Sequence, residues 1–322
     1  MDGNLYFWIG FNVFVALMLA LDLGVFNRKI HKIPLKEALI WCAVWISLAL
    51  LFTVVIYLDY SRESNVLAKQ RVLEYLTGYV IEYSLSVDNI FVFILIFSYF
   101  QVDPRFQHKV LFWGIIGAIV MRALFIFAGV ALINKFHWII YIFGAFLLYT
   151  GIKMFLETIK GKVAKVEPER NPVFKFAKRF MRIDETYNGP RFFKRKDNKL
   201  YITPLFLVLL IIESSDVIFA VDSIPAVLAI TQDPFIVYTS NIMAILGLRS
   251  LYFAISGIIM YFKRLKVGLS VVLTFIGIKM IISEFFEVPI FLSLIIIITI
   301  LSASIVWSVI ENYMEKKKVL DK

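Results

Sequence analysis

Long apolar runs alternate with short polar connections along the whole chain. Each run holds about 20 or more residues with few charges, which is the length that an α-helix needs to cross the hydrocarbon core of a bilayer. The sequence therefore predicts an all-α, polytopic membrane protein with about nine transmembrane helices. The predicted spans are 5–26, 37–58, 72–100, 109–133, 137–157, 201–231, 237–262, 266–286 and 288–311.

The composition agrees with a membrane protein. Hydrophobic residues make up 60% of the 322 residues and the mean hydropathy is +0.81, whereas the apolar share of a soluble chain is about half. The first run contains Asp22 and lacks a small-residue cleavage site, so we interpret it as a retained helix and not a signal peptide. One cysteine and three histidines are too few for a disulfide framework or a thiolate or imidazole metal cluster.

The placement of basic residues predicts the orientation of the chain. Lysine and arginine gather after the first, third, fifth, seventh and ninth runs, and the other connections are acidic, mixed or nearly uncharged. By the positive-inside rule, the N-terminus lies outside and the C-terminus lies in the cytoplasm.

The longest connection, 158–200, is strongly basic. It holds 13 Lys or Arg and 5 Asp or Glu, a net charge of +8 (13 − 5). Residues 173–182 mix apolar and basic side chains, which fits a surface helix on the anionic inner leaflet, and 192–201 predict a hairpin that turns at Asp197–Asn198. A regulatory or partner role is the alternative. We expect no nucleic-acid binding, because a position between two spans already explains the charge.

Two acidic motifs reveal an internal repeat. The third run contains Glu82-x5-Asp88-Asn89-Ile90 and the sixth contains Asp216-x5-Asp222-Ser223-Ile224, 134 residues further on. Three further matches keep the same order, with offsets that fall to 126: Asp103-Pro104 with Asp233-Pro234, Arg122 with Arg249, and Gly151-Ile152-Lys153-Met154 with Gly277-Ile278-Lys279-Met280. Four matches in register predict a duplication.

The duplication predicts the organisation of the chain. Each unit holds three spans, and an odd number means that the two units cross the membrane in opposite senses, as in the inverted repeats of secondary transporters. The predicted segments are 1–71 (two N-terminal helices), 72–157 (unit one), 158–200 (basic cytoplasmic loop), 201–286 (unit two) and 287–322 (final helix and basic tail).

The apolar runs of the two units contain five acids. On insertion scales, an acid at the centre of a membrane helix costs about 2.5–3.5 kcal/mol, so these side chains need compensation. We predict that they form a cation site near the middle of the membrane. Its residues would be Glu82, Asp88, Glu213, Asp216 and Asp222, with Asn89, Asp22, Arg122 and Arg249 as accessory residues.

The spacing of the acids in the sixth run predicts a broken helix. Glu213 and Asp216 share a helix face, whereas Asp222 points about 120° away from Asp216 on a regular helix. Pro225 supplies a cause for a break, because it lacks an N–H group and leaves the carbonyl of Val221 free.

An alternative is that the acids form structural ion pairs with Arg122, Arg249, Lys153 and Lys279. Both lysines lie near span ends, where they can reach the interface. Two arginines then remain for five acids, which leaves an excess of carboxylates.

The predicted ligands are oxygen atoms, which suit the hard cations Mg²⁺, Ca²⁺ and Mn²⁺ but do not separate them. The chain has no Walker-type phosphate loop, so an ion gradient should drive transport. We expect no enzymatic activity and no resident cofactor.

Several of these segments resemble the signature segments of the TerC family of membrane proteins. They are 82–93, 213–226 and 246–253, together with Leu-Asp-Leu around Asp22 and the segment 143–151. The resemblance covers nearly the whole chain and is strongest to the bacterial Alx branch. It implies Mn²⁺ export across the bacterial inner membrane, with the acidic motifs as the metal path. Tellurite resistance, or a scaffold that assists insertion or metalation of other proteins, is the alternative that the family also implies.

The expected partners are Mn²⁺ as the transported substrate, protons and the anionic lipids of the inner leaflet. Proton exchange follows from the chemistry of the acids, which bind either metal or protons. The oligomeric state is left open by the sequence.

Overall fold

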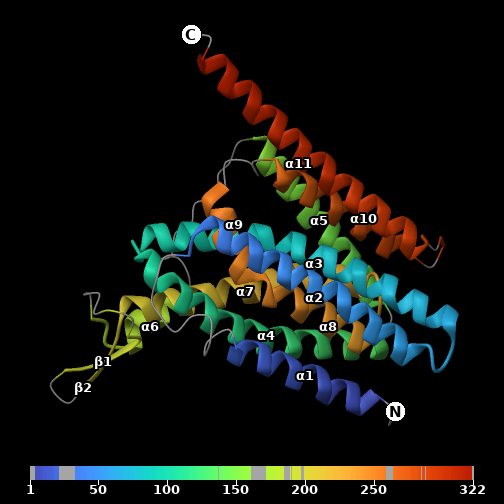
Figure 1. Cartoon of the computed structure of the whole chain (residues 1–322), viewed down its shortest axis with the longest axis horizontal. Helices are drawn as coiled ribbons and strands as arrows, with labels where there is room; N and C mark the ends of the chain where they lie inside the picture. The colour runs from blue at the N-terminus through green and yellow to red at the C-terminus, as the bar shows by residue number, and fades with distance from the viewer. Residues whose placement is uncertain are drawn as a thin grey trace.

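The computed structural model describes residues 4–21, 33–136, 138–160, 172–184, 189, 191–196, 199–258, 264–283, 285–286 and 288–320. Within them the chain is almost entirely helical (Figure 1). The elements are α1 (Asn4–Leu21), α2 (Leu35–Tyr60), α3 (Asn65–Tyr99), α4 (Pro104–Lys135), α5 (Ile139–Ile159), α6 (Pro172–Phe180), β1 (Phe193–Lys196), β2 (Lys199–Ile202), α7 (Pro204–Leu228), α8 (Pro234–Leu246), α9 (Leu248–Ile258), α10 (Leu265–Ile282) and α11 (Ile290–Leu320).

Seven of the described helices are long and apolar enough to span a membrane: α2, α3, α4, α5, α7, α10 and α11. Helices α8 and α9 meet at a bend of 43° and add an eighth span if they count as one broken helix. The described residues therefore support a polytopic membrane protein with seven or eight spans, not the nine predicted. The ninth would be α1, whose apolar part, Leu5–Leu21, is shorter than a full span, and residues 22–26 of that run lie outside the described residues.

The break predicted at Pro225 is wrong. Helix α7 runs without interruption from Pro204 to Leu228, with Pro225 inside its last turn. So close to the end of the helix, the missing N–H group removes one hydrogen bond without ending the helix. The break in this unit lies instead at Gly247, between α8 and α9.

Three helices begin in the same way. The side chains of Asp103, Thr203 and Asp233 accept hydrogen bonds from backbone N–H groups of the first turn, and a proline follows each of them. This arrangement satisfies N–H groups that have no partner within the helix, and the proline loses no hydrogen bond there. The repeated Asp-Pro pairs at 103 and 233 thus cap the first turns of α4 and α8.

Helices of the two predicted units pack on each other in a reciprocal pattern. Helix α3 packs on α7 and α8, α4 packs on α7, and α5 packs on α10. A Cβ atom on Gly277 would lie 2.8 Å from the carbonyl oxygen of Gly144, and one on Gly151 would lie 2.9 Å from that of Ser270. Both pairs, Gly151 with Gly277 and Gly144 with Ser270, are 126 residues apart (277 − 151 and 270 − 144). Equivalent residues therefore make equivalent backbone contacts.

We expect Gly277→Ala to destabilise the protein by separating α5 from α10. The new methyl group would lie 2.7 Å from the backbone nitrogen of Leu148, so the backbones must move apart, at a cost of about 1–3 kcal/mol. The matched control is Gly10→Ala, because a Cβ atom on Gly10 meets nothing within 4 Å. Thermal unfolding in detergent measures both variants, and equal transition temperatures would contradict the close helix contact.

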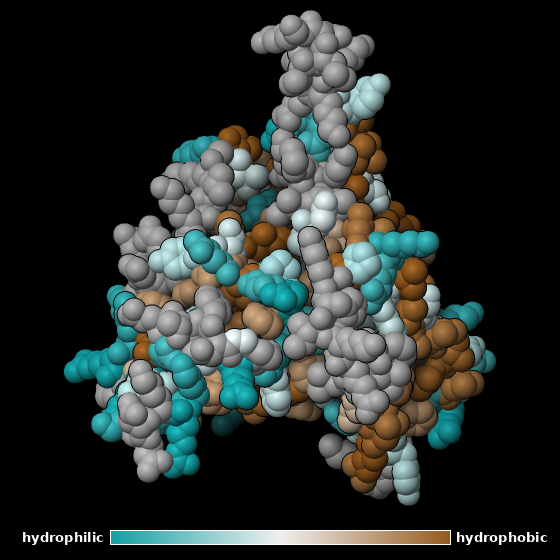
Figure 2. Space-filling model, turned by 60° about the vertical axis from the view of Figure 1, so that its left-hand side comes forward, coloured by the Kyte–Doolittle hydropathy of each residue, from teal (hydrophilic) through white to brown (hydrophobic). Residues whose placement is uncertain are grey.

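The basic loop carries a short helix and a hairpin at one end of the molecule, the left-hand end of Figure 1. Strands β1 and β2 pair antiparallel, with Lys196 opposite Lys199, which confirms the predicted hairpin; its turn residues lie outside the described residues. In α6, Phe174 is buried and the basic Lys175 and Arg179 are exposed. Figure 2 looks toward this end and shows hydrophilic side chains over much of it, with apolar side chains along the right-hand edge.

Candidate functional site

Arg122 of α4 lies at the centre of a buried polar cluster, which we call the arginine cluster. The guanidinium donates from Nη1 to Glu82 Oε1, to Asn241 Oδ1 at 2.9 Å and to Ser223 Oγ at 3.1 Å. It also donates from Nη2 to Asp216 Oδ1 at 3.3 Å and from Nε to Asp216 Oδ2 at 3.4 Å. Arg122 therefore joins an acid of α3 to an acid of α7.

All five side chains of the arginine cluster are buried, and Arg122 is only 1% exposed. Removing one partner would leave a buried charge without its hydrogen bonds, which costs free energy of folding. The stability of each residue in the cluster therefore depends on the others. The second carboxylate oxygen of Glu82 and the side-chain nitrogen of Asn241 accept or donate no hydrogen bond within the described residues. For Glu82 and Asp216, this geometry matches the structural ion pairs that the sequence left open as an alternative.

Asp88 and Asp222 form a second group, which we call the carboxylate pair. They occupy equivalent positions in the two acidic motifs, on α3 and α7. Asp88 makes an ion pair with Lys266 of α10, with 2.6 Å between Oδ1 and Nζ. Among the described residues, Asp222 is within range of the negative charge of Asp88 and the positive charge of Lys153. Both acids are only partly buried, and the Asp88 side chain is 16% exposed.

The regular geometry of α7 explains why the acids separate into two groups. Because the helix is continuous, Asp216 and Asp222 point in directions about 120° apart, so one reaches Arg122 and the other does not. Within the described part of the chain, no three His, Cys, Asp or Glu side chains are arranged to hold a single metal ion. The five acids are therefore neighbours on two packed helices, without a common centre.

The remaining predicted site residues have different surroundings. Glu213 is half-buried, and its carboxylate occupies the space that a Cβ atom on Gly117 would take, so this glycine makes room for the acid. Asn89 is buried on α3. Asp22 lies outside the described residues.

Arg249 does not occupy the place in the arginine cluster that its match with Arg122 suggests. It is buried on α9, with 3.0 Å between its Nη1 and Nε2 of His108. Together with Asp216 it lines a small cavity that is otherwise mostly apolar. The duplicated arginines therefore have different partners.

Sequence reasoning missed three polar residues at these groups. Ser223 and Asn241 donate or accept within the arginine cluster, and Lys266 pairs with Asp88. Ser223 and Asn241 are polar residues inside apolar runs, and that signal could have identified them. Lys266 belongs to the basic residues that follow the seventh run, which the positive-inside rule explains, and nothing in its local sequence indicates the pairing.

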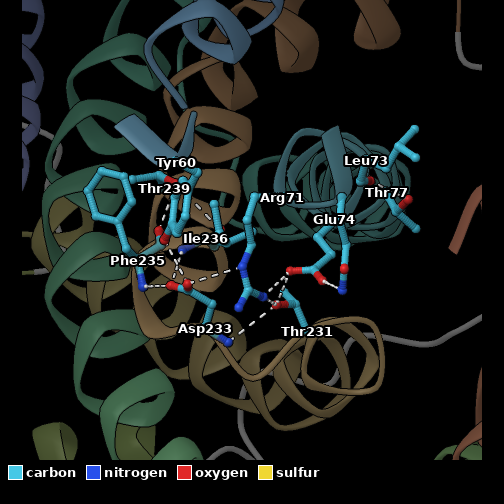
Figure 3. Close-up of polar contacts among 11 residues, drawn as sticks. Tyr60, Arg71, Leu73, Glu74, Thr77, Thr231, Asp233, Phe235, Ile236 and Thr239 are labelled. Carbon is cyan, nitrogen blue, oxygen red and sulfur yellow. Dashed lines mark hydrogen bonds and ion pairs between the residues drawn. The ribbon is translucent and has the colours of Figure 1, made fainter. Parts of the chain in front are cut away.

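Sequence reasoning also missed a polar network at the right-hand end of Figure 1, which we call the terminal network (Figure 3). Tyr60 donates to Asp233 Oδ2 at 2.6 Å, Thr231 donates to Glu74 Oε2 at 2.6 Å, and Arg71 donates to Glu74 Oε2 at 2.5 Å. Arg71 Nε also lies 3.5 Å from Asp233 Oδ2. The network joins the end of α2, the start of α3 and the turn between α7 and α8.

The opposite end of α3 is more open. A pocket there is lined by Asp103, Gln107 and Tyr252, among other residues of the α3–α4 turn and α9. Asp103 is partly exposed, and hydrogen bonds from Arg105 hold the pKa of Asp103 below its usual value. The two Asp-Pro turns therefore lie at opposite ends of α3, one in a tight polar network and the other at an open pocket.

Comparisons with known proteins place the chain in a family. The model of the "Integral membrane protein TerC family" matches residues 67–318. An uncharacterized membrane protein of Myxococcus xanthus is 48% identical over 96% of this chain and 94% of its own. The Escherichia coli (strain K12) protein named "Putative membrane-bound redox modulator Alx" is 47% identical over 98% of both chains. No solved structure matches. The family model and the near full-length relatives show that this chain belongs to the TerC family of integral membrane proteins.

Proposed function

We propose that this protein is a secondary transporter that exports Mn²⁺ from the cytoplasm. The observation that carries the proposal is the carboxylate pair: Asp88 and Asp222 are equivalent residues on the packed helices α3 and α7, both are partly buried, and the hydrogen bonds of Arg122 go to other acids. Two acids that no arginine neutralises offer a divalent cation the charge that offsets its lost hydration.

The ligands in this proposal are oxygen atoms. The carboxylates of Asp88 and Asp222 supply the charge, and retained water or neighbouring amide oxygens complete the octahedral shell that Mn²⁺ prefers. Glu213 is a third acid within the same two units that Arg122 does not hold. Glu82 and Asp216 keep α3, α4 and α7 together through Arg122, and in this proposal they shape the site without binding the ion.

Alternating access requires two units that can repack against each other. The inverted arrangement of the units is supported by two features of the fold. Thr231, just after α7, contacts Glu74 near the start of α3, so the two helices run in opposite directions. The reciprocal contacts of Gly151 and Gly277 are what two units related by a pseudo-two-fold axis would make, which supports this arrangement.

The proposed setting is the bacterial inner membrane, with the N-terminus outside and the C-terminus in the cytoplasm. The exposed basic face of α6 then lies against anionic lipids of the inner leaflet. Protons are the proposed counter-substrate, because empty carboxylates can bind them. The proposal involves no catalytic step and no resident cofactor.

The experiment is metal uptake by everted membrane vesicles that contain the protein. We expect accumulation of Mn²⁺ above that of vesicles without the protein, weaker accumulation of Mg²⁺, Ca²⁺ and Zn²⁺, and proton movement when Mn²⁺ is added. Manganese flux without proton movement, unchanged by a pH gradient at a clamped membrane potential, would exclude antiport. Flux of none of these metals would favour a scaffold that assists other membrane proteins.

A further inference from the structure

We propose that Lys266 is a tethered counter-ion that occupies Asp88 in the metal-free protein and must leave before a divalent cation can bind there. This inference rests on the proposed transport function and assigns a competitor within the chain to its substrate. The evidence begins with the ion pair between Lys266 and Asp88, in which Nζ lies 2.6 Å from Oδ1.

The contact with Lys266 differs in kind from the contacts of the arginine cluster. Arg122 holds its two acids through several donors of a rigid guanidinium, and it is 1% exposed. Lys266 offers one ammonium on a flexible stem, and its side chain is 28% exposed. A lysine of this kind is held by attraction between charges and can withdraw toward water.

The surroundings of Lys266 favour a position close to Asp88. Lys266 lies in the first turn of α10, and its Nζ is also 5.5 Å from the ring centroid of Phe91. Phe91 is three residues after Asp88, on the same face of α3. The ring attracts the ammonium weakly and so keeps it near the Asp88 carboxylate, while some N–H groups of the ammonium stay free to bond with water.

The charges explain why a divalent cation would displace the lysine. Lys266 brings one positive charge to Asp88, whereas one Mn²⁺ brings two, and Lys153 acts on Asp222 in either state. An ammonium 2.6 Å from Oδ1 of Asp88 crowds a metal ion bound to the same carboxylate and repels its charge, so each of the two weakens binding of the other. Because Lys266 belongs to α10 and Asp88 to α3, metal binding also removes an ion pair between these two helices.

The test is Mn²⁺ binding to the purified full-length protein in detergent, followed by the electron paramagnetic resonance signal of free Mn²⁺. We expect Lys266→Gln to bind Mn²⁺ about tenfold more tightly than the wild type, because the competitor is gone. Lys266→Arg should bind more weakly than the wild type, because a guanidinium can hold Asp88 with two hydrogen bonds. In an Asp88→Asn background, the change at Lys266 should have no effect.

The matched control is Arg264→Gln, a loss of one positive charge two residues away. Arg264 pairs with Glu311 of α11, so its loss should leave Mn²⁺ binding unchanged. Circular dichroism checks the fold of each variant, and Lys266→Arg carries the test if Lys266→Gln does not fold.

Each outcome decides the inference. Weaker binding by Lys266→Gln would show that the lysine positions Asp88, and equal binding would show that it does not compete; either result overturns the proposal while the wild type still binds. Absence of binding in the wild type and in every variant would instead overturn the proposed function, and this inference with it. Binding of Mn²⁺ by Lys266→Gln but not by the wild type would support the proposal, because it would show that Lys266 blocks the site completely under these conditions.

Discussion

Asp222→Asn is expected to abolish manganese efflux while the protein still folds and enters the membrane. The amide keeps the volume of the side chain but removes the charge that offsets dehydration of the ion, a loss of about 2–3 kcal/mol or roughly a hundredfold in affinity. Asp222 is partly exposed and lies outside the arginine cluster, so its neutralisation leaves Arg122 with both of its acids. Efflux from everted vesicles and the amount of inserted protein are the two measurements.

A matched control for this variant is Asp103→Asn. Asp103 lies in the turn after α3, is partly exposed and caps α4, and asparagine caps a helix as well as aspartate does. It should retain full efflux. Asp88→Asn should behave as Asp222→Asn does, because the two residues form the carboxylate pair. Normal efflux from both of these variants would remove the carboxylate pair from the transport path.

Arg122→Gln is expected to lower the stability of the protein strongly. This change leaves Glu82 and Asp216 buried without their cation, which typically costs about 3–5 kcal/mol. Thermal unfolding in detergent should show a much lower transition temperature, and the amount of inserted protein should fall. Arg105→Gln is the control, because Arg105 is 60% exposed and a surface change of this kind is worth about 0.5 kcal/mol or less.

A rescue experiment tests whether Arg122 stabilises the fold by compensating the charges of Glu82 and Asp216. If Arg122 compensates two acids, Glu82→Gln and Asp216→Asn should restore much of the stability lost in Arg122→Gln, because the neutral triple variant strands no charge. A triple variant that is less stable than Arg122→Gln alone would argue that the acids have other partners. An Arg122→Gln protein with wild-type stability would contradict the structural role directly.

The apolar pattern predicted most of the spans but not all of their ends. The third run begins at 72, whereas α3 begins at Asn65 and has 35 residues, or about 50 Å. That length exceeds the hydrocarbon thickness of about 30 Å. Hydropathy detects only the apolar part of a helix, and the first turns of α3 are polar because they carry Arg71 and Glu74 of the terminal network.

The acidic motifs predicted which side chains would gather, but not how they would divide. The helical period already separates Asp222 from Asp216 by about 120°, and a break at Pro225 would be needed to point both acids toward one site. The continuous α7 keeps them apart. Lys266 could not be predicted at Asp88 by any local pattern, because the pairing depends on how α10 packs against α3.

The pairing of Glu82 with Arg122 bears on how the chain enters the membrane during synthesis. The two residues lie on consecutive helices, so both are made before any part of the second unit. The ion pair between Glu82 and Arg122 can form as soon as α3 and α4 have left the translocation machinery, which lowers the cost of placing either residue in lipid. When α7 emerges, Asp216 meets an arginine that already has one partner. A Glu82→Gln protein should therefore deliver α4 to the membrane less efficiently, because Arg122 then has no acid partner until α7 has been made.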